Sequence, residues 1–239
     1  MADNKKSKAE TEAEVRKINA EAAQAEAEAR RAEAEAVKIE AEASEAQIKA
    51  QKAYKARKRE LASDEENFLY RFHGEVSKSS VKNCMIKLSE WSRLNPKCDI
   101  EIVFASGGGS IIDGFELFDF IQDLRGRGHK ITTGSLGMAA SMAGILLQAG
   151  SHRWIGHQAW MMIHRAAFGA VGKTFEVEDE VKLVKRIEER ILDIFIKRSR
   201  LSKLKIKRNW DRKDWWLSAD ECKELGLVDE IRCTLLDDK

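Results

Sequence analysis

The sequence predicts an α/β domain preceded by a long N-terminal α-helix. The first sixty residues are dominated by alanine, glutamate, lysine and arginine and repeat every seven residues. Beyond them, short apolar runs alternate with glycine-containing turns and with longer segments of helical spacing. A succession of strand, glycine loop, helix and strand is typical of α/β proteins, which bind ligands where loops leave the carboxyl ends of strands. We therefore expect a helical arm at residues 1–62 and one domain at residues 63–239.

The composition excludes several classes of protein. Acidic and basic residues nearly cancel, leaving a formal net charge of +2, so charge gives no argument for a nucleic-acid partner. Cys84, Cys98, Cys222 and Cys233 are scattered without metal-ligand spacing, so we expect reduced thiols and no metal. No run approaches the roughly 18 apolar residues of a membrane helix, and the N-terminus lacks the apolar core of a signal peptide. A cytoplasmic protein without membrane contact is expected.

The arm carries a heptad seam from Thr11 to Arg59, in which apolar residues recur at alternating steps of three and four. The seam consists of Val15, Ile18, Ala22, Ala25, Ala29, Ala32, Ala36, Ile39, Ala43, Ala46, Ala50 and Ala53. Because alanine buries little area, at about 25 cal/mol per Å², two interpretations stay open. One is a solvated helix held by Glu/Lys pairs, and the other is close-packed self-association. Residues 10–45 are mainly acidic, whereas residues 49–59 form a basic collar.

The elements of the domain follow from hydrophobic periodicity and from turn and cap residues. Strands are expected at residues 68–74, 100–104, 130–134, 153–155, 159–163 and 227–231. Helices are expected at residues 77–94, at 111–124, at 142–147, from about 174 to 200, and at 218–225. A basic, tryptophan-rich loop should connect the last two helices.

Three segments of the domain could carry chemistry. Ser141 lies among small residues at a strand-to-helix junction, where free N–H groups bind anions and where serine is also a common helix cap. The glycines at 107–109 allow a sharp bend that presents backbone N–H groups, although they do not continue as a GxGxxG fingerprint. His164 ends a buried strand, where a neutral imidazole can take a proton from a nearby hydroxyl.

Together these segments resemble the proteolytic subunit of Clp protease, within the ClpP/crotonase fold, over about residues 68–232. The family's Ser-Pro-Gly-Gly is similar to Ser-Gly-Gly-Gly at 106–109, with Gly114 at the matching distance. Its remaining motifs G-x-A-A-S-M, M-I-H and L-S-A-x-E-A-x-x-x-G-L-V-D are similar to residues 137–142, 162–164 and 217–229. All four motifs occur in the family's order. The resemblance implies an α/β spiral of β-β-α units.

The resemblance also implies a serine endopeptidase that hydrolyses peptide bonds through an acyl-enzyme, without cofactor or metal. Ser141 would be the nucleophile and His164 the general base. The backbone N–H groups of Gly108 and Met142 would form the oxyanion hole, in which losing one donor costs about 10²–10³ in rate. It further implies a homo-oligomeric ring whose protomers meet through the long helix at residues 174–200.

The third member of the triad is the point at which the sequence departs from the family pattern. Counting back from the closing motif gives Trp210, and counting forward from the long helix gives Asn209. One extra residue brings in Asp211, which is our preferred interpretation, and Asp214 lies farther along. A carboxylate and an amide can each accept from the N–H of His164.

The arm has no counterpart in the short N-terminal loops of the family and resembles a scaffold-like extension. This architecture leads to the hypothesis of a bacteriophage version, located in the host cytoplasm, whose arm binds capsid or scaffold proteins during capsid maturation. An ATPase partner, which the family often has, does not follow from these residues.

A basic run at residues 197–213 is interleaved with Trp210, Trp215 and Trp216, and could stack on nucleic-acid bases. Because no recognised binding module surrounds it, we interpret it as a solvated helix end with core tryptophans and expect no nucleic-acid partner. Two rival functions stay open. One is a non-catalytic scaffold of the same fold, and the other is a crotonase-type enzyme that acts on an acyl thioester.

Overall fold

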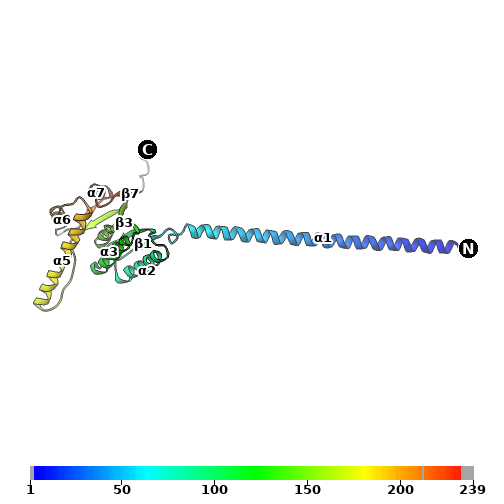
Figure 1. Ribbon diagram of the computed structural model, residues 1–239, viewed down its shortest axis with the longest axis horizontal. Coiled ribbons are helices and arrows are strands. Elements are labelled where there is room, and N and C mark those ends of the chain that lie inside the picture. Colours follow the sequence, from blue (N-terminus) through cyan, green and yellow to red (C-terminus); the bar gives the residue numbers. More distant parts are fainter. Residues whose placement is uncertain (1–2, 212, 233–239) are drawn as a thin grey trace. The chain divides into compact units, whose positions relative to one another are not determined.

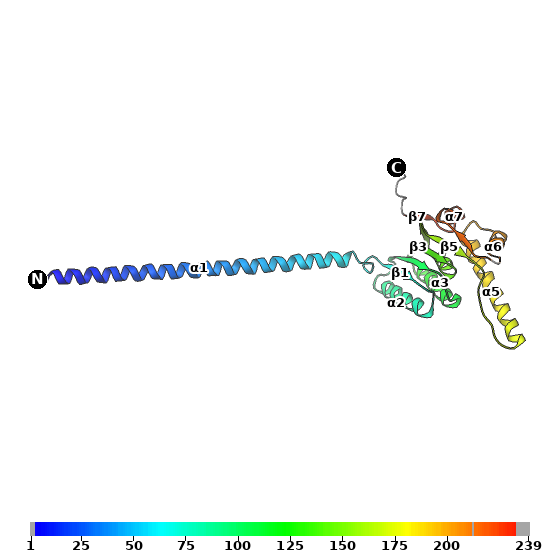
Figure 2. The same ribbon diagram turned by 180° about the vertical axis from the view of Figure 1, so that it is seen from behind.

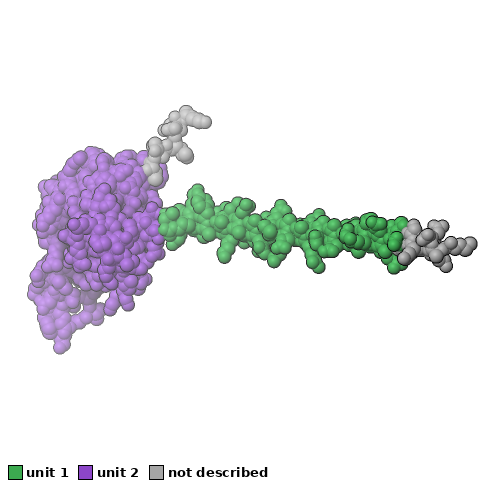
Figure 3. Space-filling view, turned by 45° about the vertical axis from the view of Figure 1, so that its right-hand side comes forward, with its two compact units in different colours: residues 1–62 green, residues 63–239 purple. Residues whose placement is uncertain are grey.

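The computed structural model describes residues 3–211 and 213–232, and the chain divides into two compact units, residues 1–62 and 63–239 (Figure 3). The first unit is one helix, α1 (Asp3–Leu61), of 59 residues, about 90 Å long at a rise of 1.5 Å per residue. Its richness in alanine and glutamate favours an unbroken helix. From Glu10 onward every side chain of α1 is exposed. The predicted long helix is therefore confirmed, and its apolar seam is exposed.

The second unit is built on a sheet of mainly parallel strands (Figures 1 and 2). Five parallel strands lie in the spatial order β1 (Leu69–His73), β2 (Asp99–Ser106), β3 (Lys130–Ala140), β4 (His152–Gly156) and β7 (Glu230–Arg232). Two further strands leave this order, because β5 (Trp160–Ile163) pairs with the end of β3 and β6 (Trp215–Leu217) runs antiparallel to β5. The α/β prediction is confirmed.

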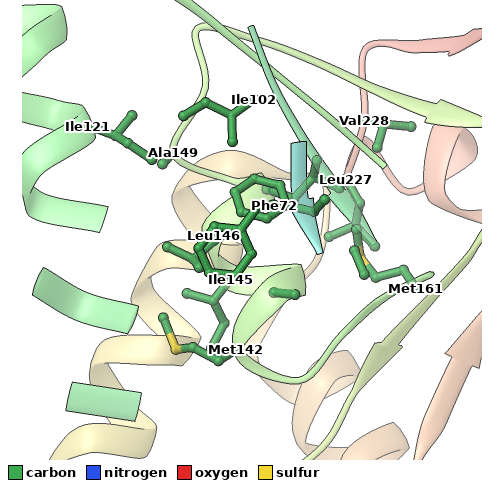
Figure 4. Packing of buried hydrophobic residues seen from close by; sticks show 14 of the residues in the cluster. Phe72, Ile102, Ile121, Met142, Ile145, Leu146, Ala149, Met161, Leu227 and Val228 are labelled. Atoms are coloured by element: carbon green, nitrogen blue, oxygen red, sulfur yellow. The ribbon is translucent and has the colours of Figure 1, made fainter. Parts of the chain in front are cut away.

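The helices cover this sheet and supply much of the core. They are α2 (Lys78–Leu94), α3 (Ile111–Gly126), α4 (Met142–Leu147), α5 (Thr174–Arg198), α6 (Lys203–Trp210) and α7 (Ala219–Glu224). Helix α4 is buried along its whole length. Figure 4 shows its Met142, Ile145 and Leu146 lying in a cluster with Phe72 and Met161. The segment that follows Ser141 is therefore fixed by the core of the domain.

Strand β3 changes its neighbours part of the way along. Its first half, residues 130–135, pairs with β2, and from Thr132 also with β4, whereas residues 138–140 pair with β5. The register against β2 shifts between Phe104 and Ser106, and Gly137 adopts a φ of 73°, which suits glycine. The strand is thus longer than the expected 130–134 and carries the chain directly to Ser141.

One expectation for the C-terminal part is corrected. The segment expected to be a loop contains α6 and β6, whereas the helix expected at residues 142–147 is present as α4. Helix α6 forms because Ser202 caps its first turn and because Ile206 and Trp210, four residues apart, bury one face. The cap residue and the two apolar residues are present in the sequence, but they are few among the surrounding lysines and arginines.

The buried side chains of helix α5 lie in its C-terminal half. Its buried residues are Glu188, Ile191, Leu192 and Phe195. The N-terminal half extends away from the sheet in Figures 1 and 2, and its Phe175 and Leu183 are 59% and 47% exposed. An amphipathic helix with an uncovered apolar face is typical of a surface that meets another molecule.

The described cysteines Cys84, Cys98 and Cys222 are free thiols, and Cys233 lies outside the described residues. Burial raises the pKa of the Cys84 thiol, and it raises the pKa of Cys222 to about 12. Both therefore stay protonated at neutral pH, as expected for inert core thiols. Within the described part of the chain, no helix is long and apolar enough to cross a membrane.

A buried arginine ties β4 to the turn before β7. Arg153 is 5% exposed, and its guanidinium donates to the Asp229 carboxylate at 2.6 and 3.0 Å and to Gln148 Oε1 at 2.7 Å. Burial by itself would raise the pKa of Asp229, but the hydrogen bonds and charge of Arg153 outweigh it and hold that pKa below its usual value. The folded state therefore favours the ionised carboxylate.

We expect Asp229→Asn to lose about 1–2 kcal/mol of folding stability at pH 7, because buried Arg153 is left without its counter-charge; partial exposure of the carboxylate keeps this loss modest. Since the folded-state pKa is depressed, the wild-type stabilisation exists above the unfolded-state pKa of about 3.9 and is lost as pH falls through the folded-state value. The two proteins should converge once the pH falls below the folded-state pKa of Asp229, where the carboxyl is protonated in both states.

Urea unfolding at a series of pH values measures this difference. Asp99→Asn is the matched control, because the Asp99 carboxylate is 74% exposed and lies 3.9 Å from Lys130. It should change stability little at any pH. A stability gap for Asp229→Asn that stayed constant from pH 7 to pH 2 would show that the charge is not responsible.

Candidate active site

Ser141 lies on a strained turn between β3 and α4. Its φ of 53° and ψ of −123° are unusual for a residue with a side chain, and such strain is characteristic of functional turns. Ser141 is at the N-cap position of α4, yet its side chain makes no capping hydrogen bond. Its Oγ lies instead 2.7 Å from His164 Nε2. The geometry thus favours a serine paired with histidine over a helix cap.

His164 reaches this position because β5 pairs with the end of β3. Ala140 is in register with Met162, and the Ser141 N–H donates to the Met162 carbonyl at 2.9 Å. Ser141 directly follows β3 and His164 directly follows β5, so the two side chains meet just beyond the ends of the paired strands. In the tautomer with its proton on Nδ1, the imidazole can accept a hydrogen bond from the Ser141 hydroxyl at Nε2.

Among the described residues, the carboxylate paired with His164 is that of Asp214. Its Oδ1 lies 3.6 Å from His164 Nδ1, longer than a hydrogen bond but close enough for the charges to interact. Strand β6 explains the position, because Trp215 pairs with Ile163 across the antiparallel ladder and Asp214 precedes it. The strand pairing carries this aspartate to the histidine.

Asp211, the aspartate preferred from the sequence, lies elsewhere in the structure. Its Oδ1 accepts from Arg165 Nη1 at 3.4 Å, and Asn209, the second choice, donates to the Lys205 carbonyl within α6. Asp211 lies away from His164 because residues 203–210 form helix α6, which the sequence did not predict, and Asp211 is the C-cap residue of this helix. The structure therefore brings Ser141, His164 and Asp214 together.

The glycine loop after β2 lies against Ser141. A Cβ on Gly108, whose φ is 96°, would fall 2.6 Å from Ser141 Cβ and 2.9 Å from Met142 N. The segment after β1 holds the loop, since Val76 N donates to Gly108 O at 2.8 Å and Ser110 N donates to Val76 O at 2.7 Å. The two expected oxyanion donors, Gly108 and Met142, are thus adjacent.

These two donors differ in their present hydrogen bonding. The Gly108 N–H donates to Ser106 Oγ at 3.1 Å, so it must leave that hydroxyl before it can bind an oxyanion. Met142 is the first residue of α4, where the N–H has no partner within the helix. The Met142 side chain packs tightly against Gly114 of α3. A Cβ added to Gly114 would fall 2.3 Å from Met142 Cγ, so any residue larger than glycine at position 114 would clash with Met142.

A cleft of about 80 Å³ with a mixed polar and apolar lining opens beside Ser141 and His164. Its apolar lining consists of Ile111, Met142, Ile145, Ile163, Ala166, Ala167, Ile191 and Phe195. Such a lining can hold a hydrophobic side chain next to the serine hydroxyl.

Arg165, the residue after His164, anchors the site to α5. Its Nε and Nη2 donate to the two carboxylate oxygens of Glu188 at 3.0 and 2.9 Å, and Glu188 is only 8% exposed. The hydrogen bonds to Glu188 and the charge of Glu188, with a smaller effect of Asp211, raise the pKa of the Arg165 guanidinium, which stays charged. This bidentate pair was not foreseen from the sequence, since nothing in the spacing of residues 165 and 188 indicates contact.

Two further histidines have structural contacts away from Ser141. His129, 5% exposed, bonds to Ser92 Oγ at 2.8 Å and to the Cys98 carbonyl at 3.0 Å, while His152 pairs with Glu230 at 2.9 Å. Among the described residues no group of His, Cys, Asp or Glu could hold a metal ion.

A serine on a strained strand-to-helix turn, paired with histidine above a mainly parallel sheet, is typical of serine hydrolases of α/β fold. The family model of Clp protease matches residues 58–234, most of the chain. The chain therefore belongs to the Clp protease family, and both the resemblance and the ClpP-like fold are confirmed. Members of this family act on protein substrates and generally assemble into oligomeric rings.

The loop offers a matched pair of glycine substitutions. Gly108→Ala should destabilise the domain by about 2 kcal/mol or more and displace Ser141, because the new methyl group clashes with the Ser141 turn and the positive φ disfavours a side chain. At Gly107 a Cβ would meet nothing within 4 Å, so Gly107→Ala should leave stability within about 0.5 kcal/mol. Thermal unfolding compares the two. Equal stability of both variants would refute the close approach of the loop to Ser141.

Proposed function

We propose that the protein is a ClpP-like serine endopeptidase in which Ser141 is the nucleophile and His164 the general base. The observation that carries the proposal is the 2.7 Å separation of Ser141 Oγ and His164 Nε2 on a strained turn of a domain that belongs to the Clp protease family. A serine hydroxyl is a weak nucleophile at neutral pH until an adjacent base takes its proton.

The reaction proceeds in two halves. His164 Nε2 takes the hydroxyl proton as Ser141 Oγ bonds to the scissile carbonyl carbon, and the imidazolium then gives that proton to the leaving amine as the peptide bond breaks. In the second half His164 takes a proton from water, the resulting hydroxide attacks the acyl ester, and the proton returns to Ser141. The products are a new carboxyl group and a new amine.

The negative oxygen of each tetrahedral intermediate requires fixed N–H donors. We assign these to Met142, at the start of α4, and Gly108, whose N–H would exchange Ser106 Oγ for the oxyanion. The exchange replaces one neutral hydrogen bond by a charge-assisted one, which is stronger. Gly108 has no side chain to oppose the rotation of its peptide group.

We assign the role of orienting His164 to Asp214. A closer approach of about half an ångström would convert the 3.6 Å contact into a hydrogen bond from Nδ1–H. Catalytic hydrogen bonds are commonly long before substrate binds. A carboxylate in this position also stabilises the imidazolium that forms during the reaction.

We further propose that protomers associate through the projecting half of α5, whose Phe175 and Leu183 are exposed. The Arg165–Glu188 pair would then connect this contact to the strand end that carries His164. The role in bacteriophage capsid maturation stays a hypothesis that rests on the architecture of the arm.

Covalent labelling by a fluorophosphonate tests the proposed chemistry. We expect one adduct, on Ser141, none in Ser141→Ala, and labelling at least 10³-fold slower in His164→Ala, because the hydroxyl then lacks its base. Mass spectrometry of tryptic peptides locates the adduct. Cleavage of a fluorogenic peptide should follow the same order.

The rival functions give different results. A non-catalytic scaffold would show no adduct in the wild type. A crotonase-type enzyme would hydrolyse an acyl thioester, and this activity would survive Ser141→Ala. Either result would refute the peptidase proposal.

The two aspartates near the site provide a matched comparison. We expect Asp214→Asn to lower kcat/KM for peptide cleavage by about 10–10³-fold, because the imidazolium loses its charge partner. Asp211→Asn should change it by less than about threefold, since Asp211 pairs with exposed Arg165. A larger loss in Asp211→Asn than in Asp214→Asn would reassign the orienting role to Asp211.

A further inference from the structure

Helix α1 has a pattern of charge that neither the fold of the domain nor its chemistry explains. The large apolar residues of its seam, Val15, Ile18 and Ile39, are 51%, 59% and 60% exposed. We define the seam face as heptad positions a and d with the flanking positions e and g, with Val15 at position a. The back face is then position f with the flanking positions b and c, and it lies on the opposite side of the helix.

The charges between residues 12 and 42 are completely segregated between the two faces. All acids stand at e or g of the seam face: Glu12, Glu14, Glu21, Glu26, Glu28, Glu33, Glu35, Glu40 and Glu42. All bases stand at b or c of the back face: Arg16, Lys17, Arg30, Arg31 and Lys38. Position f between these bases is always alanine: Ala13, Ala20, Ala27, Ala34 and Ala41. Each face is thus a stripe of small or apolar residues with charged edges of a single sign.

Ion pairs within the helix do not account for this pattern. The pairs Lys17–Glu21, Arg30–Glu26 and Lys38–Glu42 span 3.8–3.9 Å between side chains that are 66–83% exposed. Each such pair contributes about 0.3–0.5 kcal/mol. A solvated helix gains the same stability from ion pairs placed anywhere around it. Helix stability alone therefore does not require an uncharged stripe at positions a and d and another at position f.

The glutamates along the edges of the seam face disfavour pairing of two seam faces. In a parallel pair, position g faces position e of the next heptad in the partner. Glutamate would then face glutamate at 21 and 26, at 28 and 33, and at 35 and 40. An antiparallel pair sets g against g and e against e, which again opposes glutamates. Like charges along both edges act against this association.

We propose that the seam face of one arm packs on the back face of the arm of a second copy of this chain. For parallel helices this packing sets g opposite c and e opposite b, so that Glu28 and Glu35 face Arg31 and Lys38 of the neighbour. Alanine on both surfaces lets the helices approach closely. Since every arm carries both faces, the contact repeats from copy to copy, and such a heterologous contact closes into a ring when the rotation permits.

This contact involves no residue of the active site, so it can be tested on a full-length chain in which Ser141→Ala excludes self-cleavage. One such chain carries Ala32→Cys on the seam face, and a second, with a different affinity tag, carries Ala34→Cys on the back face. The two are co-expressed and treated with a short bismaleimide. Peptide mapping distinguishes the new thiols from the native cysteines, and the chain without added cysteine gives the background.

We expect a covalent product that joins residue 32 of one chain to residue 34 of the other, and none that joins two copies of residue 32. Seam-to-seam pairing would give the 32–32 product from Ala32→Cys alone. A solvated arm would give neither product although circular dichroism reports a formed helix. Either of these results would overturn the proposal.

A charge exchange tests the electrostatic part. Glu28→Lys with Glu35→Lys should abolish the 32–34 product, because lysine then faces the basic edge of the neighbour. Adding Arg31→Glu and Lys38→Glu to the same chain should restore it, since each contact again joins opposite charges. If the fourfold variant stays without product while its helicity equals that of the parent, the assigned facing of g and c is wrong.

Discussion

The pairing of β5 with the end of β3 is the contact on which the candidate site depends. Three residue pairs, from Met138 with Trp160 to Ala140 with Met162, bring together two strand ends that are separated by α4 and β4 in the sequence. A hydrogen bond from Ser141 N to the Met162 carbonyl then fixes the backbone at the turn. Because the serine and the histidine both leave this short ladder at its carboxyl end, their side chains meet without any further device.

The surroundings of this ladder restrict what can move. The core holds α4 from Met142 to Leu147, so the start of that helix, with its N–H donors, is fixed. The glycine loop is held by backbone hydrogen bonds to the segment after β1, but the Gly108 N–H is engaged by Ser106. The Met142 N–H is thus held in place, whereas the Gly108 N–H can change its partner. Substrate binding can therefore select the loop arrangement in which the Gly108 N–H is released from Ser106.

Helix α5 connects the site to the outer surface of the domain. Its inner half contributes Ile191 and Phe195 to the cleft beside Ser141, and its Glu188 holds Arg165. The outer half is amphipathic and uncovered. Any molecule that binds there acts on an element that also lines the cleft, which offers a physical route from assembly to activity.

The sequence by itself determined the long helix and the α/β order of the domain, and it singled out Ser141 and His164 as candidate site residues, because heptad spacing, strand alternation and motifs are local properties. It did not determine the partner of His164. Asp211 and Asp214 lie in the same polar segment, and only the winding of α6 and the antiparallel register of β6 with β5 bring Asp214 to the imidazole. The contact of Arg165 with Glu188 also arises from tertiary packing, since residues far apart in the chain meet where helices and strands are fixed by the core.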